Sequence, residues 1–261
     1  RIASHLVSFG TYGLDIGAFT PFLYAFRERE YILDLFEMVC GARITFSYMR
    51  IGGLSHDLPQ EFTPALQQFL DEMPRYIDEY QRLLSENEIL LSRTKGQGVL
   101  SPEAAIDYGV SGPNLRASGV SWDLRKAQPY DVYDKLDFDV PIGLDGDCWD
   151  RYYLRVQEMY ESLRIVEQAL EQIPQGSVTS SLGRRLIRPP KGEVFVRAEN
   201  PRGEIGVYLV SDGTDKPYRV KIRPPSFCNL SAIKHMVKGA WIADAVIILG
   251  SLDIVLGEVD R

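Results

Sequence analysis

The sequence predicts a mainly α-helical fold with a small antiparallel β element (α+β). Residues 61–85 and 149–173 carry apolar side chains at the three- and four-residue spacing of amphipathic helices. Residues 193–197, 206–210 and 218–222 instead alternate apolar and polar side chains between Gly and Pro turns. This alternation is typical of short antiparallel strands.

Composition limits the class of protein. The chain has 261 residues, of which 45% are apolar and 25% charged, and a formal net charge of −7. These values are ordinary for a globular protein with a sizeable core, in one domain or two. The sequence lacks a Lys/Arg-rich block, so a nucleic-acid partner is not expected. The longest apolar run, 240–249, contains Asp244 and is about half as long as a transmembrane helix requires.

Two helices are expected within residues 1–50. The first shows helical spacing from its start and is expected to be interrupted at Gly10 and Gly13, because glycine weakens helices. The second is expected at about 21–40, where apolar residues again recur at helical spacing.

The next elements follow from turn signals and periodicity. Gly and Pro residues within 52–59 predict a loop. Residues 61–85 then form the long amphipathic helix, with a bend expected at Pro74. Residues 86–100 are expected to form a shorter helix and a loop.

Three segments organise the chain. Residues 1–174 are expected to form a helical core that includes a long loop region at 107–148, where Gly, Pro, Asp and Tyr are frequent and periodicity is weak. Residues 175–192 are a predicted polar linker. Residues 193–261 are expected to hold the β element and a buried C-terminal helix. Because Arg1 falls inside an apparent helix without an N-cap, we expect the chain to be a fragment of a longer protein.

The histidines and cysteines do not have the spacing of a metal site or a CxxC pair. Buried free thiols in a reducing compartment are the favoured interpretation of the cysteines. His56, in the predicted loop, is expected at the surface, whereas His235 gives no specific signal. The residues are Cys40, Cys148, Cys228, His5, His56 and His235.

His5 and Asp15 are the first candidates for chemistry. His5 is either a proton-handling group or a helix histidine held by a hydrogen bond, and the second interpretation is favoured. Asp15 lies in an apolar, glycine-rich break. It either caps the backbone N–H groups of Gly17 or Ala18, or is a buried carboxylate with a distant partner, and both alternatives stay open.

Other charged residues have ordinary explanations. The alternating Arg and Glu residues at 27–30 predict a solvated helix face on which some pairs could be buried. Arg43 and Arg50 are expected at a protein interface, held by carboxylates. Signatures of a P-loop, a Rossmann fingerprint or a nucleophile elbow are absent from the sequence.

The C-terminal stretch joins an apolar run directly to charged residues. Asp253 follows the run at 240–249, and the chain ends with Asp260 and Arg261. A buried charge is costly unless it is paired or serves a site. We therefore expect an ordered, buried end rather than a frayed one.

Short motifs recur along the whole chain: RIASHL (1–6), DIGA (15–18), TPF (20–22), RERE (27–30), RIGG (50–53), LRASG (115–119), PKGE (190–193), RGE (202–204) and PSF (225–227). Together with the C-terminal stretch they resemble the large quinone-site subunit of complex I, the NADH–quinone oxidoreductase. That family is similar to the large subunit of nickel–iron hydrogenases with its metal ligands lost, so the resemblance implies a hydrogenase-like helical core. Val255 stands where hydrogenases have the first Cys of a terminal Asp-Pro-Cys motif.

The resemblance implies a quinone chamber between this chain and the neighbouring subunit that carries the terminal iron–sulfur cluster. Family members bind the quinone head with a His and a Tyr in an N-terminal part that this sequence lacks. Asp15 is implied as the catalytic partner of that His, because a His–Asp pair can deliver a proton. Chamber lining is implied for Phe22, Asp253, Val255 and Arg261.

The same resemblance places His5, Thr45 and Arg50 in the proton or cluster environment. Many relatives have a His at the position of Thr45, and threonine does not titrate. We therefore expect a low-potential cluster and a low-potential quinone such as menaquinone. The segment 177–188 is shorter than in relatives, either truly or because residues are missing from the chain.

The favoured function is the quinone-binding subunit of a proton-pumping NADH–quinone oxidoreductase, inactive alone. The alternatives are the equivalent subunit of a ferredoxin- or deazaflavin-dependent membrane oxidoreductase, and a non-catalytic scaffold. The chain itself is expected to bind no cofactor, with quinone as substrate and iron–sulfur clusters in neighbouring subunits. Implied partners are the other peripheral-arm subunits, especially the terminal-cluster subunit, and a membrane-arm subunit at the quinone entrance. The implied location is peripheral, on the cytoplasmic or matrix side of the membrane.

Overall fold

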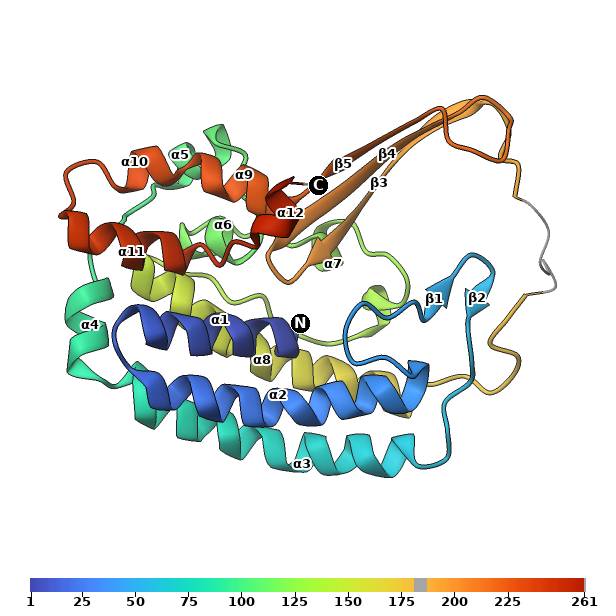
Figure 1. Ribbon diagram of the computed structural model, residues 1–261, viewed down its shortest axis with the longest axis horizontal. Helices are drawn as coiled ribbons and strands as arrows, with labels where there is room; N and C mark the ends of the chain where they lie inside the picture. The colour runs from blue at the N-terminus through green and yellow to red at the C-terminus, as the bar shows by residue number, and fades with distance from the viewer. Residues whose placement is uncertain (181–186, 261) are drawn as a thin grey trace.

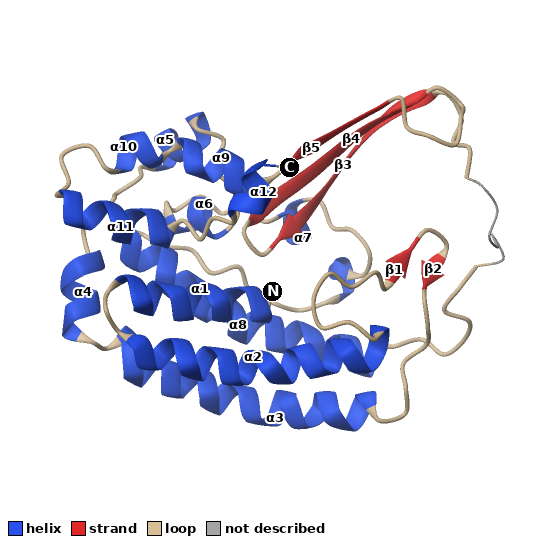
Figure 2. Cartoon of the chain, in the orientation of Figure 1, coloured by secondary structure: helices blue, strands red, loops and turns tan. Residues whose placement is uncertain are grey.

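The computed structural model describes residues 1–180 and 187–260 and confirms a helical fold with small antiparallel sheets. Helices α1, α2, α3 and α8 form the main body, α1 and α8 packing together while α2 and α3 lie alongside (Figure 1). Helix α11, near the C-terminus, packs on α1, and the larger sheet projects away from the helices (Figure 2). The helices are α1 Ile2–Asp15, α2 Phe19–Cys40, α3 Phe62–Tyr80, α4 Glu88–Thr94, α5 Pro102–Asp107, α6 Pro113–Ala117, α7 Leu124–Ala127, α8 Cys148–Glu171, α9 Pro225–Ser231, α10 Ile233–Met236, α11 Ile242–Ser251 and α12 Leu256–Asp260.

Helix α1 continues through both of its glycines, so the predicted interruption at Gly10 and Gly13 is wrong. These glycines mark a close crossing with the next helix. A Cβ at Gly10 would lie 3.2 Å from the Cα of Phe22, and one at Gly13 would lie 3.1 Å from the carbonyl oxygen of Ala18. The packing therefore favours glycine here, and it holds the end of α1 against the start of α2.

Helix α3 contains Pro74 and continues into a π-helical turn at Gln81–Ser85 instead of remaining α-helical to its end. Its apolar side packs into the main core. Tyr80 is buried and donates a hydrogen bond of 2.5 Å to Glu28, which also accepts from Arg27 at 2.5 Å. One glutamate of the alternating run is thus buried between α2 and α3 and not solvated.

Helix α8 confirms the predicted long helix. Asp147 caps its start by accepting a hydrogen bond from the backbone N–H of Asp150 at 2.9 Å. The preceding region, 107–148, differs from the expectation of a loop because it contains α6 and α7. Arg116 of α6 is fully buried, so this region contributes charged groups to the interior.

The strands confirm the predicted antiparallel sheet, in the order β3-β4-β5. Strands β3 and β4 pair from Gly192 opposite Ser211 to Asn200 opposite Gly203, so a tight turn at Pro201 and Arg202 joins them. A second, two-stranded sheet pairs a strand that precedes the loop expected at 52–59 with a strand inside it. The strands are β1 Met49–Arg50, β2 Gly53–Leu54, β3 Gly192–Asn200, β4 Gly203–Ser211 and β5 Arg219–Arg223.

The C-terminal apolar run is only half buried, which corrects the expectation of a buried helix. Ile247 and Ile248 of α11 are buried, whereas Trp241 and Ile242 are 82% and 94% exposed. The run is apolar on nearly every side, so its sequence does not show which side of the helix packs against the rest of the protein. In the structure, α1, α4 and α8 pack against one side of α11 and leave the other exposed. Within the described parts of the chain, none of the helices is both long and apolar enough to cross a membrane.

Candidate functional site

Asp15 ends α1 and lies against the C-terminal helix. The backbone N–H groups of Gly17 and Ala18 donate to Leu14 and Gly13, so Asp15 caps neither of them. The side chain is exposed, which also contradicts the buried alternative. Its Oδ2 nevertheless lies so close to Gly250 of α11 that a Cβ there would overlap with it. This partial desolvation raises the pKa of Asp15 above its ordinary value.

Asp253 is buried, as expected, whereas Asp260 is exposed, so the expected burial of the whole C-terminal end is wrong. Asp253 follows α11 with a φ of 52°, an unusual left-handed conformation for a residue other than glycine. Arg202 donates to Oδ1 at 3.3 Å, and Arg155 Nε lies 3.7 Å from Oδ2. Burial raises the pKa of Asp253, although both arginines act in the opposite direction.

The structure brings Asp15 and Asp253 to one turn. The backbone N–H of Asp253 donates to the carbonyl oxygen of Gly250 at 3.1 Å, and Gly250 is the residue on which the Asp15 carboxylate packs. Two acids that are distant in the sequence therefore both contact Gly250, the first residue of this turn. Both have raised pKa values, and desolvation is the main cause for each: partial for Asp15 and nearly complete for Asp253.

Phe22 lies near the start of α2, and Val255 lies between α11 and α12. Phe22 belongs to an aromatic row on α2, with its ring centroid 6.0 Å from that of Phe19 and 4.2 Å from that of Phe26. Val255 is 40% exposed, and its backbone N–H donates to Ser226 at 3.3 Å. Arg261 lies outside the described residues, and so does half of the short segment 177–188, namely 181–186.

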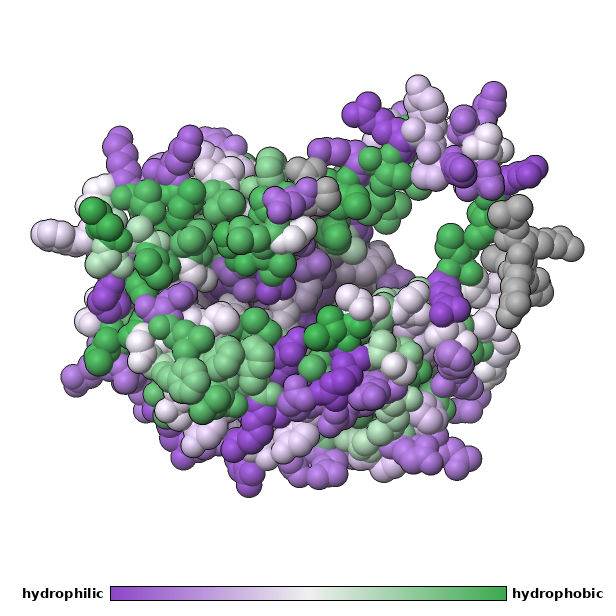
Figure 3. All heavy atoms as spheres, in the orientation of Figure 1, coloured by the Kyte–Doolittle hydropathy of each residue, from purple (hydrophilic) through white to green (hydrophobic). Residues whose placement is uncertain are grey.

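One face of the molecule is hollowed. Figure 3 shows apolar side chains gathered over α11 and over the start of α2, with a recess between the two groups. Exposed apolar residues on these elements include Phe19, Leu23, Trp241, Ile242 and Val246. Surfaces of this kind mark contacts with another protein or with a ligand.

Thr45 and Arg50 do not lie near Asp15. They follow the C-terminal end of α2, whose 22 residues span about 33 Å, whereas Asp15 precedes its N-terminal end. Both side chains are exposed. Arg50 donates to the carbonyl oxygen of Ser47 at 3.2 Å and not to a carboxylate, which corrects that expectation. Arg43 does contact carboxylates, those of Glu30, Asp34 and Glu37.

His5 belongs to a buried ionic cluster that sequence reasoning missed. His5 Nε2 donates to Glu158 at 2.8 Å, and Glu158 also accepts from Arg116 at 2.6 Å. Burial lowers the pKa of His5 to about 3, so His5 is neutral at physiological pH. Burial acts to raise the pKa of Glu158, but Arg116, His5 and Arg1 outweigh it and hold this pKa well below its usual range. His5 is thus the hydrogen-bonded helix histidine of the favoured interpretation.

The cluster extends to the sheet. Arg116 also donates to Glu199 of β3 at 2.8 Å, and Asp123 pairs with Arg125 at 2.7 Å beside it. The only sequence signal was the spacing of Arg151, Arg155 and Glu158, which places three charged residues on one face of α8. That face points inward.

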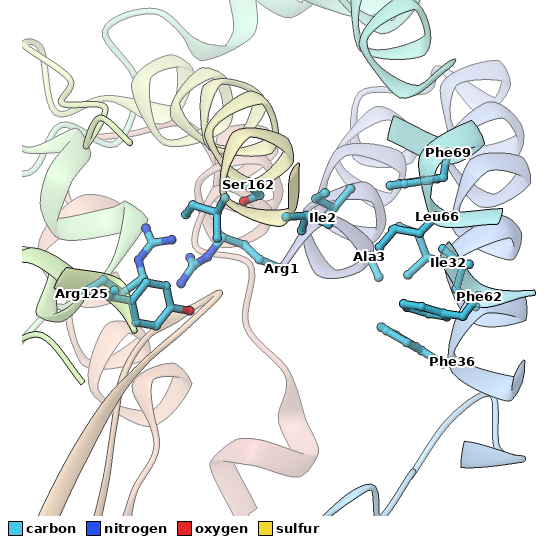
Figure 4. Close-up of a pocket in the computed structure, with 14 residues that line it drawn as sticks. Arg1, Ile2, Ala3, Ile32, Phe36, Phe62, Leu66, Phe69, Arg125 and Ser162 are labelled. Atoms are coloured by element: carbon cyan, nitrogen blue, oxygen red, sulfur yellow. The ribbon is translucent and has the colours of Figure 1, made fainter. Parts of the chain in front are cut away.

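The structure also contains a cavity of about 360 Å³ between the start of α1 and helices α2, α3 and α8. Its walls are mostly apolar, with phenylalanines at one end and the guanidinium groups of Arg1 and Arg125 at the other (Figure 4). The predicted chamber residues Asp15, Phe22 and Asp253 are not among those that line it.

A resident metal centre is not supported in the described residues. They contain no group of three or more His, Cys, Asp or Glu side chains that could hold a metal ion. The cysteines are free, and Cys148 is buried as expected, but Cys40 and Cys228 are partly exposed, which corrects the expectation of buried thiols. His56 is exposed, as expected, and so is His235.

The protein has a helical body with a small sheet, a turn next to two acids and an exposed apolar face. These features are typical of one subunit of a larger assembly. The model of the family "Respiratory-chain NADH dehydrogenase, 49 Kd subunit" matches residues 15–188 and 181–261. The NADH-quinone oxidoreductase subunit (designated D) of Bacillus cereus is 54% identical over 260 residues, covering 100% of this chain and 71% of that protein. Its counterpart from Clostridium beijerinckii is 53% identical over 261 residues, covering 100% of this chain and 70% of that protein. The chain belongs to this family of complex I subunits and acts as one subunit of an oxidoreductase complex.

Proposed function

We propose that this chain forms one wall of the quinone-reduction chamber in a proton-pumping NADH–quinone oxidoreductase. The terminal iron–sulfur cluster of a neighbouring subunit supplies electrons to the quinone there. The turn between Gly250 and Asp253 faces the quinone head, and Asp15, Phe22 and Val255 line the chamber around it. The relatives named NADH-quinone oxidoreductase support the choice of substrate.

The meeting of Asp15 and Asp253 at one turn is the observation that carries this proposal. Reduction of a quinone to a quinol takes up two electrons and two protons. A carboxyl group whose pKa is raised by desolvation holds a proton closer to neutral pH than a fully hydrated one does, and so can supply it. The apolar residues around the recess suit a lipid-soluble substrate.

The exposed apolar face of α11 supports a contact with another subunit. Trp241, Ile242 and Val246 expose more than half of their surface. We assign this face to the membrane-arm partner at the quinone entrance, with the chain peripheral on the cytoplasmic or matrix side.

Replacing Asp253 by Ala tests the assignment. We expect the complex that assembles to show a higher quinone KM, a lower kcat, or both, when turnover is normalised to the amount of intact complex, because the variant lacks a polar group that contacts the substrate. Steady-state kinetics with NADH and decylubiquinone measure the effect. If the variant only reduces the amount of assembled complex, the residue is structural and the assignment is wrong.

Replacing Gly250 by Ala displaces the Asp15 carboxylate without changing its charge. The new Cβ overlaps with Oδ2 of Asp15 and lies 3.2 Å from the ring of Tyr12. Alanine favours the helical conformation that residue 250 already has. We expect quinone reductase turnover to fall several-fold while assembly persists. Wild-type turnover would show that the position of Asp15 is unimportant.

Thr45 leads to a prediction about the cluster. The nearest cluster in the partner subunit is expected to have a low midpoint potential that changes little with pH, since threonine at this position cannot couple a proton to the electron. Redox titration of the intact complex at several pH values measures this. A steep pH dependence would refute both this prediction and the use of a low-potential quinone such as menaquinone.

A further inference from the structure

We propose that Arg202 is a positioning residue that holds the Asp253 carboxylate in the orientation and charge state in which it meets the quinone. The inference rests on the proposed function, because it concerns how Asp253 acts in the chamber. Arg202 lies in the turn between β3 and β4, far from Asp253 in the sequence.

All three nitrogen atoms of the Arg202 guanidinium group are used. Nε donates to the backbone oxygen of Asp253 at 3.0 Å, and Nη2 donates to its Oδ1 at 3.3 Å. Nη1 donates to Ser4 of α1 at 2.9 Å. A single side chain therefore joins the hairpin turn, the first helix and the loop that follows α11. A planar guanidinium fork suits such a role because its donors have fixed directions.

The main chain at Arg202 is itself held tightly. Gly203 and Gly112, with φ values of 141° and 68°, pass so close that a Cβ at Gly112 would overlap with the backbone of Gly203. Asn229 donates to the carbonyl oxygen of Arg202 at 3.0 Å and accepts from the backbone N–H of Ser111 at 3.0 Å. These backbone contacts hold the hairpin turn in place independently of the contact between the Arg202 side chain and Asp253.

Asp253 needs such support. Its left-handed backbone conformation is unfavourable for a side chain with a Cβ, and persists only where the surroundings hold it. Arg202 binds both the backbone and Oδ1, which leaves Oδ2 as a buried oxygen without a hydrogen-bond partner in the described chain. One oxygen is thereby fixed while the other stays available to change its partner or to take a proton.

The charges around Asp253 come from three directions. Arg155 faces it from α8, Arg202 from the hairpin turn and Glu258 from α12, while α1 presents the neutral hydroxyl of Ser4 to Arg202. Burial and Glu258 raise the pKa of Asp253, and the two arginines lower it. Removing the charge of Arg202 therefore raises the pKa further, so a larger fraction of Asp253 is protonated at a given pH.

The pH profile of quinone reduction tests the inference in the assembled complex, with NADH and decylubiquinone as substrates. Arg202→Gln should move the alkaline limb of kcat/KM, on which activity falls as Asp253 loses its proton, upward by about one pH unit or more, as expected when an adjacent opposite charge is lost. Arg202→Lys keeps the charge but not the fork, and should move the limb less. Arg197→Gln, on β3 of the same hairpin, should leave the profile unchanged.

Asp253→Asn separates the outcomes. In the Asp253→Asn background, Arg202→Gln should cause no further shift, because the group that titrates is absent. If Asp253→Asn has wild-type kinetics, the proposed function of Asp253 fails. If Asp253→Asn lowers turnover but Arg202→Gln leaves the limb in place, only the role of Arg202 is overturned. If neither Arg202 variant assembles while Arg197→Gln does, Arg202 is structural and the inference is wrong.

Discussion

Replacing Asp15 by Asn is expected to lower quinone reductase turnover of the assembled complex by at least about tenfold, because general acid–base groups commonly contribute more than that. Asparagine keeps the size of the side chain but cannot donate a carboxyl proton. The side chain is exposed and makes no hydrogen bond that the fold requires among the described residues, so assembly should persist. Turnover normalised to the amount of intact complex measures the effect.

Asp71→Asn provides the matched control. Asp71 is an exposed carboxylate on α3 whose Oδ1 accepts a hydrogen bond from Gln67. Its replacement should change neither turnover nor assembly. Unchanged turnover in Asp15→Asn would count against a catalytic role for Asp15. A comparable loss in both variants would mean that turnover responds to surface charge in general.

Glu158→Gln is expected to have the largest effect on stability. The substitution removes the carboxylate that Arg116, Arg1 and His5 share, and leaves buried arginine charge without full compensation. Breaking a buried ion pair by removing one partner commonly costs about 3–5 kcal/mol. We expect less of this chain in the assembled complex and a lower Tm. Glu167→Gln, at an exposed position of the same helix, should have almost no effect.

The pH dependence of stability follows from the same cluster. The folded-state pKa of Glu158 lies below its ordinary value of 4.5, so its contribution is present above that pH and decreases as the pH falls. His5 acts in the same direction, since its pKa is lowered to about 3 and protonation at acid pH favours the unfolded chain. Thermal melting at several acidic pH values should show a shallower pH dependence for Glu158→Gln than for the wild type. Parallel curves would contradict the assigned charge states.

Periodicity predicted the long elements and failed where tertiary packing decides. Helix α8 and the three-stranded sheet follow from regular spacing, which is local information. The glycines of α1 were misjudged because their packing partner, Phe22, belongs to another helix. The exposed face of α11 was missed for the same reason. Which sides of an apolar helix are buried depends on the elements that pack against it and not on its own residues.

The residues of the candidate site were likewise predicted only where local sequence carries the information. The sequence indicated that Asp253 is buried, because a charge directly after an apolar run needs a partner. It could not identify Arg202 and Arg155 as those partners, since they lie on separate elements. The position of Asp15 beside Gly250 and the burial of Arg116 likewise depend on contacts between distant segments.

A density map of the intact complex with a quinone analogue bound tests the central claim most directly. The account predicts that the ring of the analogue lies in the recess beside the turn between Gly250 and Asp253, with the carboxylates of Asp15 and Asp253 around it. A ring bound elsewhere, with both carboxylates facing bulk water, would contradict the account.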